Sequence, residues 1–335
     1  MAHLPPDPFA RFLEIYDALN ADRSFFQNAA SFRFAAIAAA TTEGDGATTA
    51  RAIRRMNDEI DREVGTFGAI TKDARLVLAA MLYASGDSVR GFYDQVARVR
   101  RMFREHGMRR AGSYETMATW ILHRQASGRP VEAATVARMR AIYDGMKSHH
   151  WWLTGPDDFP ACALLTSAKG EPTAICNRIE SIYQALRQEG FSSGDPLQTA
   201  ANVLHFVGLS PHETARRYAR LADEFRRAGI RMWQSDYDEL AILCFLEHDA
   251  TTIVPRVVDR RAQMERLHPK PDHVQTFNLA CSVVFLELVQ VDRALHHITD
   301  AKALTDIQAV VAAQQAAVIA AVTSATAAVT VASSH

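Results

Sequence analysis

Histidine side chains are the first candidates for chemistry in this chain. His123 and His205 each stand five residues after an alanine in an apolar segment, so equivalent histidines could face one cavity and bind a metal or move protons. Their segments are not consecutive, and Thr166 holds the equivalent position between them. Hydrogen-bonded core histidines are the competing interpretation.

Arginines recur at intervals of 40, 40 and 42 residues, each five residues before an aromatic side chain: Arg98, Arg138, Arg178 and Arg220. In the structural interpretation each guanidinium pairs with a carboxylate or with carbonyls of the neighbouring segment. Arg178, which lies nearest the middle of the repeated segments, would then be the most sensitive to substitution. In the functional interpretation the arginines form a basic strip that binds a small anionic ligand or an acidic peptide.

Trp151 and Trp152 stand in the segment that fits the repeating pattern least. Two adjacent indoles are costly to expose, so one could fill a joint between helices while the other faces a ligand or partner. A packed plug, capped by Asp157 or Asp158, is the competing interpretation. Asp158 also belongs to a series of acidic residues that stand three positions before an alanine at the centre of an apolar segment.

Common cofactor and metal motifs are absent from the sequence. It contains no G-x-G-x-x-G, no G-x-x-x-x-G-K-[ST], no G-x-S-x-G and no H-E-x-x-H. We therefore predict neither a cofactor nor a metal. If a metal were bound, His268, Asp272 and His273, or His123 and His205, would be the residues to examine.

A repeating series of helices is expected to position these side chains. A small residue recurs at intervals of 39, 43, 39, 41 and 39 residues in the middle of short apolar segments, at Ala79, Ala118, Ala161, Ala200, Ala241 and Ala280. A longer amphipathic segment follows each of the first five, and no alternation of period two predicts a strand. We expect an all-α fold, a right-handed, solenoid-like array of about six helical hairpins with a period of about 40 residues.

This pattern divides the chain into three parts. Residues 1–70 would form an N-terminal helical cap or first repeat, residues 71–300 the helical-hairpin repeats, and residues 301–335 an Ala/Val-rich helix with a frayed tail. No charged side chain follows Asp306, but polar residues interrupt this apolar tail, so we do not predict a membrane span.

Composition narrows the class of protein further. The chain has 37 basic and 38 acidic residues, which gives no basic footprint for nucleic acid. Its four cysteines form no C-x-x-C motif and fit reduced core thiols. The N-terminus lacks the pattern of a secretory signal, so we expect a cytoplasmic protein.

The segment from His149 to Ala161 resembles a bacterial family, Domain of Unknown Function family 4003. The string L-T-G-x-D-D…A-x-L-L, here from Leu153 to Leu165, carries the resemblance together with the helical texture and the Ala-rich tail. It would cover nearly the whole chain. The resemblance implies a bacterial helical protein and brings no activity, cofactor or catalytic residue.

A non-enzymatic binding or scaffold protein is the function that these patterns favour. Its partner would be a protein or peptide, or a small anionic ligand, and its oligomeric state is not readable from the sequence. The alternatives are a small-molecule sensor and an enzyme with a polar cavity between helices, where His123, His205, Arg178 and Asp158 would converge. A closed pocket with convergent histidines and carboxylates would favour the enzyme.

Overall fold

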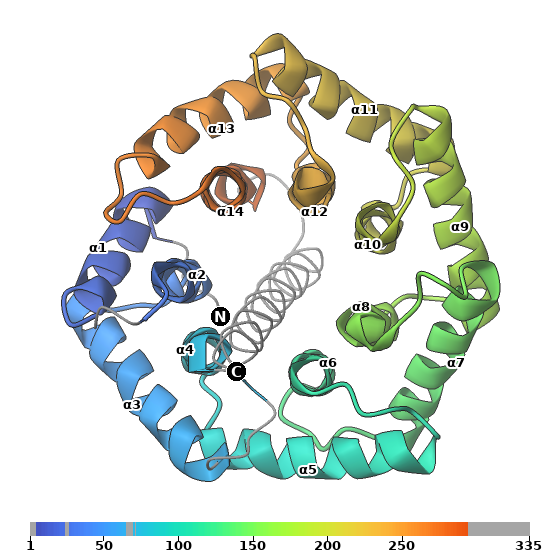
Figure 1. Ribbon diagram of the computed structural model, residues 1–335, viewed down its shortest axis with the longest axis horizontal. Coiled ribbons are helices and arrows are strands. Elements are labelled where there is room, and N and C mark those ends of the chain that lie inside the picture. Colours follow the sequence, from blue (N-terminus) through green and yellow to red (C-terminus); the bar gives the residue numbers. More distant parts are fainter. Residues whose placement is uncertain (1–4, 24–26, 65–69, 71, 294–335) are drawn as a thin grey trace, which may run out of the picture.

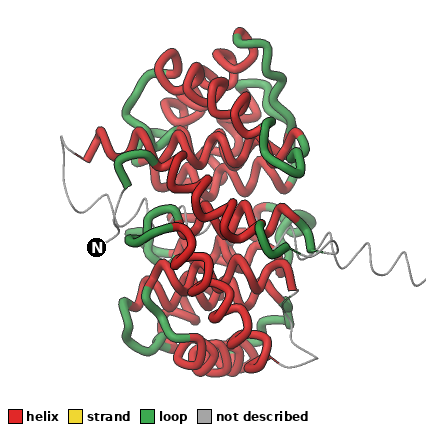
Figure 2. The backbone as a smooth tube through the Cα atoms, turned by 90° about the vertical axis from the view of Figure 1, so that its left-hand side faces the viewer, coloured by secondary structure: helices red, strands yellow, loops and turns green. Residues whose placement is uncertain are grey.

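The computed structural model describes residues 5–23, 27–64, 70 and 72–293. The predicted all-helical fold is confirmed for this part of the chain, which contains fourteen α-helices. In Figure 2 the described residues form helices and loops, with no strand. The predicted C-terminal helix at 301–335 lies outside the described residues.

The helices alternate between two concentric layers of a ring (Figure 1). The outer layer contains the odd-numbered helices α1 (Pro8–Asn20), α3 (Gly46–Val64), α5 (Val89–Glu105), α7 (Ala133–His149), α9 (Pro172–Gln188), α11 (Pro211–Arg227) and α13 (Ala250–Met264). The inner layer contains α2 (Ala29–Ala39), α4 (Lys72–Ser85), α6 (Ser113–Ala126), α8 (Phe159–Leu165), α10 (Asp195–Leu204), α12 (Tyr237–Leu243) and α14 (His273–Arg293). Each of the six alanines singled out in the sequence lies in an inner helix.

The two layers differ in how much of each helix is buried. Every residue of α8, from Phe159 to Leu165, is buried, as expected for an apolar helix surrounded by other helices. In α5 the buried residues form a single stripe that includes Phe92, Val96 and Val99, and the opposite face is polar. The inner helices therefore form the core, and the outer helices cover it with one apolar face each.

The two ends of the described chain meet, whereas the sequence predicted a solenoid-like array with an N-terminal cap or first repeat at one end. Helix α14 packs against α1 and α2. The Tyr16 hydroxyl donates to the His268 carbonyl at 2.7 Å, and Arg33 Nη1 donates to Gln275 Oε1 at 2.7 Å. Helices α1 and α2 thus adjoin the last described helix instead of capping a free end.

Short 3-10 helices join some of these elements. They are η1 (Pro156–Asp158), η2 (His205–Val207) and η3 (Gln234–Asp236). The connections from an outer to the next inner helix contain η1 and η3, whereas η2 follows an inner helix. Among the helices that are described, none is both long and apolar enough to cross a lipid bilayer.

Candidate functional site

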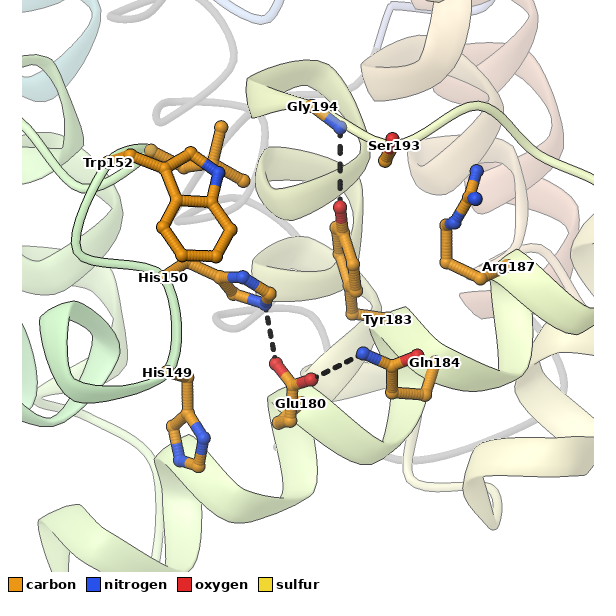
Figure 3. A pocket seen from close by; sticks show the side chains of 10 residues that line it. His149, His150, Trp152, Glu180, Tyr183, Gln184, Arg187, Ser193 and Gly194 are labelled. Atoms are coloured by element: carbon orange, nitrogen blue, oxygen red, sulfur yellow. Dashed lines mark hydrogen bonds and ion pairs between the residues drawn. The ribbon is translucent and has the colours of Figure 1, made fainter.

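An open hollow of about 450 Å³ lies beside the ends of two neighbouring outer helices (Figure 3). The end of α7 and the segment that follows it form one wall. The second half of α9 and the segment that leads to α10 form the other. The lining residues are His149, His150, Trp152, Leu153, Glu180, Tyr183, Gln184, Arg187, Ser193 and Gly194.

Helical spacing on α9 places its polar residues at this hollow. The buried face of α9 includes Ile175, Ile179 and Ile182, so the helix packs on the core through this side. Glu180 and Gln184 are four residues apart and therefore lie on one face of the helix. Gln184 Nε2 donates to Glu180 Oε1 at 2.7 Å, which links the two side chains.

A hydrogen bond joins the two walls of the hollow. His150 Nε2 lies 2.6 Å from Glu180 Oε2, and both side chains are largely buried. The His150 ring also packs on the Tyr183 ring, with 4.7 Å between the ring centroids. The Tyr183 hydroxyl accepts a hydrogen bond from Gly194 N at 3.3 Å. These contacts hold the floor of the hollow in one arrangement.

Trp151 and Trp152 expose most of their surface at the edge of the hollow. Their exposed fractions are 69% and 65%, larger than that of any other large hydrophobic side chain described. The two indole rings are perpendicular, with 5.9 Å between their centroids. Trp152 belongs to the lining, and its ring meets His150 edge-on. The plug interpretation, which requires buried indoles, does not describe these residues.

Asp158 lies close to this segment but contributes to the helix start and not to the hollow. Its Oδ2 accepts from Gly155 N at 2.9 Å, which fixes the turn into η1. Burial raises the pKa of Asp158 to about 7, and the carboxylates of Asp157 and Asp195 act in the same direction. Gln198 Nε2 lies 3.5 Å from the other carboxylate oxygen. The same turn recurs at η3, where Asp236 accepts from Trp233 N at 2.8 Å.

The arginines of the repeated series mostly contact backbone carbonyls. Arg138 donates from Nε to Thr166 O at 3.0 Å and from Nη2 to Ala168 O and Gly170 O, each at 2.7 Å. Arg178 Nη2 donates to Leu209 O. Each contact joins an outer helix to the connection between the next inner and outer helices, as in the structural interpretation.

Arg220 departs from this series. It is exposed, and Arg217 on the same helix donates to the equivalent carbonyl, that of Leu246. The repeat spacing therefore predicted Arg220 for the carbonyl contact, but Arg217 of α11 makes it. Two arginines of the series are only half-buried, Arg138 and Arg178, and both are engaged by main-chain oxygens.

His123 and His205 occupy separate environments. His123 Nε2 lies 3.0 Å from Asp87 Oδ1, in the connection that follows α4. Burial, followed by the charge of Arg178, lowers the pKa of His205 to about 4. No hydrogen bond or ion pair links His123, His205 and Asp158 in the described structure, so no contact supports one polar cavity formed by these residues. Within the described ranges, no three potential metal ligands lie together.

Sequence reasoning identified one wall of the hollow and missed the other. Trp152 was a candidate, but Glu180, Tyr183 and Arg187 were not. The spacing of Glu180 and Gln184 places them on one helix face, yet only the packing of α7 beside α9 shows that this face meets His150. A search for polar pairs four residues apart on α9, the second α-helix after the tryptophans, could have found Glu180.

One protein family matches almost the whole chain. The sequence profile of the family described as "Protein of unknown function (DUF4003)" matches residues 15–316. The uncharacterized protein YeaA of Bacillus subtilis (strain 168) is 26% identical over 189 residues, which are 56% of this chain and 55% of that protein. The chain thus spans about half the length of this curated relative. No solved structure matches.

Proposed function

The chain belongs to the family described as Protein of unknown function (DUF4003), as the sequence resemblance predicted, and we propose that it is a non-enzymatic binding protein. Its ligand would occupy the hollow beside Trp151 and Trp152. The observation that carries this proposal is the exposure of two adjacent indoles, 69% and 65%, at the edge of a polar hollow. Exposed aromatic surface of this kind is typical of interaction sites.

The environment of His150 supports binding over catalysis. A histidine that acts as a general base needs a ring nitrogen within reach of the substrate. Nε2 of His150 is engaged by Glu180, and Nδ1 is buried without a hydrogen-bond partner within the described structure. Neither nitrogen is therefore available to a ligand in the hollow. The alternative of an enzyme with His123, His205, Arg178 and Asp158 in one cavity has no such support.

The arginine contacts also argue against the predicted basic strip as the binding site. Arg138 directs its donors to three carbonyls, which leaves it poorly placed to bind an anionic partner. The indole-lined hollow replaces the strip as the proposed contact surface. A peptide or protein partner, and a small ligand, both remain compatible with a surface of this kind.

The scaffold of the proposed binding protein would be a tandem array with a period of about 40 residues. The positions of the six alanines in inner helices support this interpretation. Related contacts from Arg138, Arg178 and Arg217 to the connection after the next inner helix support it as well. A cytoplasmic location is part of the proposal, and the four buried, unpaired cysteines are compatible with it.

A differential capture experiment tests the proposed function. Wild-type protein and Trp151→Ala/Trp152→Ala are incubated with a bacterial cell extract and desalted, and the retained molecules are identified by mass spectrometry. Trp233→Ala is the matched control, because Trp233 is also exposed. One face of its ring is occupied by the Arg231 guanidinium, whose Cζ lies 4.1 Å from the ring centroid. We expect wild type and control to retain a molecule that the double variant loses. Equal retention by all three proteins, or none by any, would contradict the proposal.

A further inference from the structure

We infer that the hollow beside Trp152 takes an uncharged saccharide, a refinement that rests on the proposed function. Its walls differ in chemistry: the indole of Trp152 is on one side, and hydrogen-bonding side chains of α9 are on the other (Figure 3). A pyranose ring has the matching pair of surfaces, a C–H face and a rim of hydroxyl groups.

The apolar wall suits the C–H face of a sugar. Trp152 is 65% exposed, so an indole face remains open to a ligand. Trp151 stands perpendicular to it and is 69% exposed, which extends the aromatic surface beyond the hollow. Aromatic rings gain from burial against such flat apolar surfaces while their polar edges stay in water. A second sugar unit of an oligosaccharide could therefore lie along Trp151.

The polar wall offers both donors and acceptors. Gln184 uses its Nε2 on Glu180, and its Oε1 makes no hydrogen bond in the described structure. Arg187 Nη1 donates to Phe191 O at 2.6 Å, which anchors the guanidinium and leaves its other N–H groups for a ligand. The Tyr183 hydroxyl accepts from Gly194 N and can donate its own proton. Vicinal hydroxyls, which both donate and accept, match this mixture.

The charges in the lining favour an uncharged ligand. Glu180 contributes a carboxylate and Arg187 a guanidinium. The carboxylate repels an anionic ligand and the guanidinium repels a cationic one. Leu153 is the one aliphatic side chain among the lining residues, which gives little surface for an apolar peptide side chain. The volume of about 450 Å³ lies in the range of small-molecule sites and leaves room for a short oligosaccharide.

Titration with defined saccharides tests this inference. The probes are cellotetraose, maltotetraose, mannotetraose and N-acetylated chitotetraose, all uncharged, with tetragalacturonic acid and a neutral tetrapeptide for comparison. Binding is followed by isothermal calorimetry and by tryptophan fluorescence. We expect at least one uncharged saccharide to bind more tightly than both comparison probes. Trp152→Ala should weaken that binding about three- to tenfold. Trp233→Ala should leave it unchanged, and circular dichroism verifies that both variants are folded.

Different results would contradict the saccharide inference and the proposed function. If no uncharged saccharide binds at concentrations up to about 10 mM, which corresponds to a binding free energy too weak for a built site, the inference is wrong. Binding that Trp152→Ala does not weaken would also overturn it. In either case, a molecule of another class that the capture experiment shows to depend on Trp151 and Trp152 would preserve the proposed function. Failure of both experiments would reject both proposals.

Discussion

Replacement of Arg138 by methionine removes a side chain that joins two neighbouring parts of the ring. Its guanidinium donates to the carbonyls of Thr166, Ala168 and Gly170, in the connection between α8 and α9. Methionine retains much of the aliphatic volume but donates no hydrogen bond. The variant therefore separates the contribution of the carbonyl contacts from that of packing.

The magnitude follows from the exposure of the three contacts. Water can replace the exposed bond to Gly170, so this bond contributes little. The bonds to Thr166 and Ala168 are partly buried, and each contributes about 1 kcal/mol to the free energy of unfolding. We expect Arg138→Met to destabilise the protein by roughly 2 kcal/mol. With an m-value of about 4 kcal/mol/M in urea, the midpoint falls by roughly 0.5 M.

Urea denaturation followed by far-UV circular dichroism measures this shift. Arg220→Met is the matched control, because Arg220 is exposed and makes no hydrogen bond in the described structure. Its midpoint should stay close to that of wild type. Arg178→Met should give an intermediate value, since Arg178 makes one exposed carbonyl contact. This order reverses the sequence-based expectation that Arg178 is the most sensitive. Equal midpoints for Arg138→Met and Arg220→Met would refute the reasoning.

Two other predictions concern the ring closure and a buried carboxyl group. Arg33 is 2% exposed and donates to Gln275 Oε1 and to the Pro269 carbonyl, so Arg33→Met should lower the free energy of unfolding by about 1–3 kcal/mol and speed amide hydrogen exchange in α14. Unchanged exchange there would argue against closure through Arg33. Burial raises the pKa of Asp158 from 3.8 to about 7, so the folded state binds more protons than the unfolded state between these values. Stability from this group is therefore complete below about pH 4 and is lost as pH rises to about 7. Denaturation at several pH values should show a loss in wild type that exceeds that of Asp158→Asn by a few kcal/mol, on the order of 1.4 kcal/mol per pKa unit, and parallel curves would contradict it.

The sequence was sufficient to locate the inner helices but not to close the ring. Small residues such as Ala118 and Ala200 lie where apolar segments cross the core, and this burial leaves a clear periodic signal. Closure depends on the angle between successive helices, which no single residue encodes. Tyr16 and Arg33 meet residues more than 240 positions away, His268 and Gln275. Such contacts leave no local pattern in the sequence.

The hollow was predictable only in part for a related reason. Trp151 and Trp152 were noticed because adjacent indoles are unusual, but their exposure required the structure. Glu180 and Arg187 look like ordinary solvated residues of an amphipathic helix. They become part of a site because α9 packs beside the end of α7, where His150 meets Glu180. A helical register says which face a residue occupies, and tertiary packing decides what that face meets.

The tryptophan indoles provide the most direct measurement of where a ligand binds. The chain has four tryptophans, so the indole Nε1–H region of a ¹H–¹⁵N spectrum should contain four signals. Single alanine variants assign them to Trp120, Trp151, Trp152 and Trp233. On addition of the molecule retained in the capture experiment, or of the saccharide that binds in titration, the signals of Trp151 and Trp152 should move together. The signals of buried Trp120 and of Trp233 should stay in place. Movement of Trp120 or Trp233 with no change at Trp151 and Trp152 would place the ligand elsewhere and contradict the account.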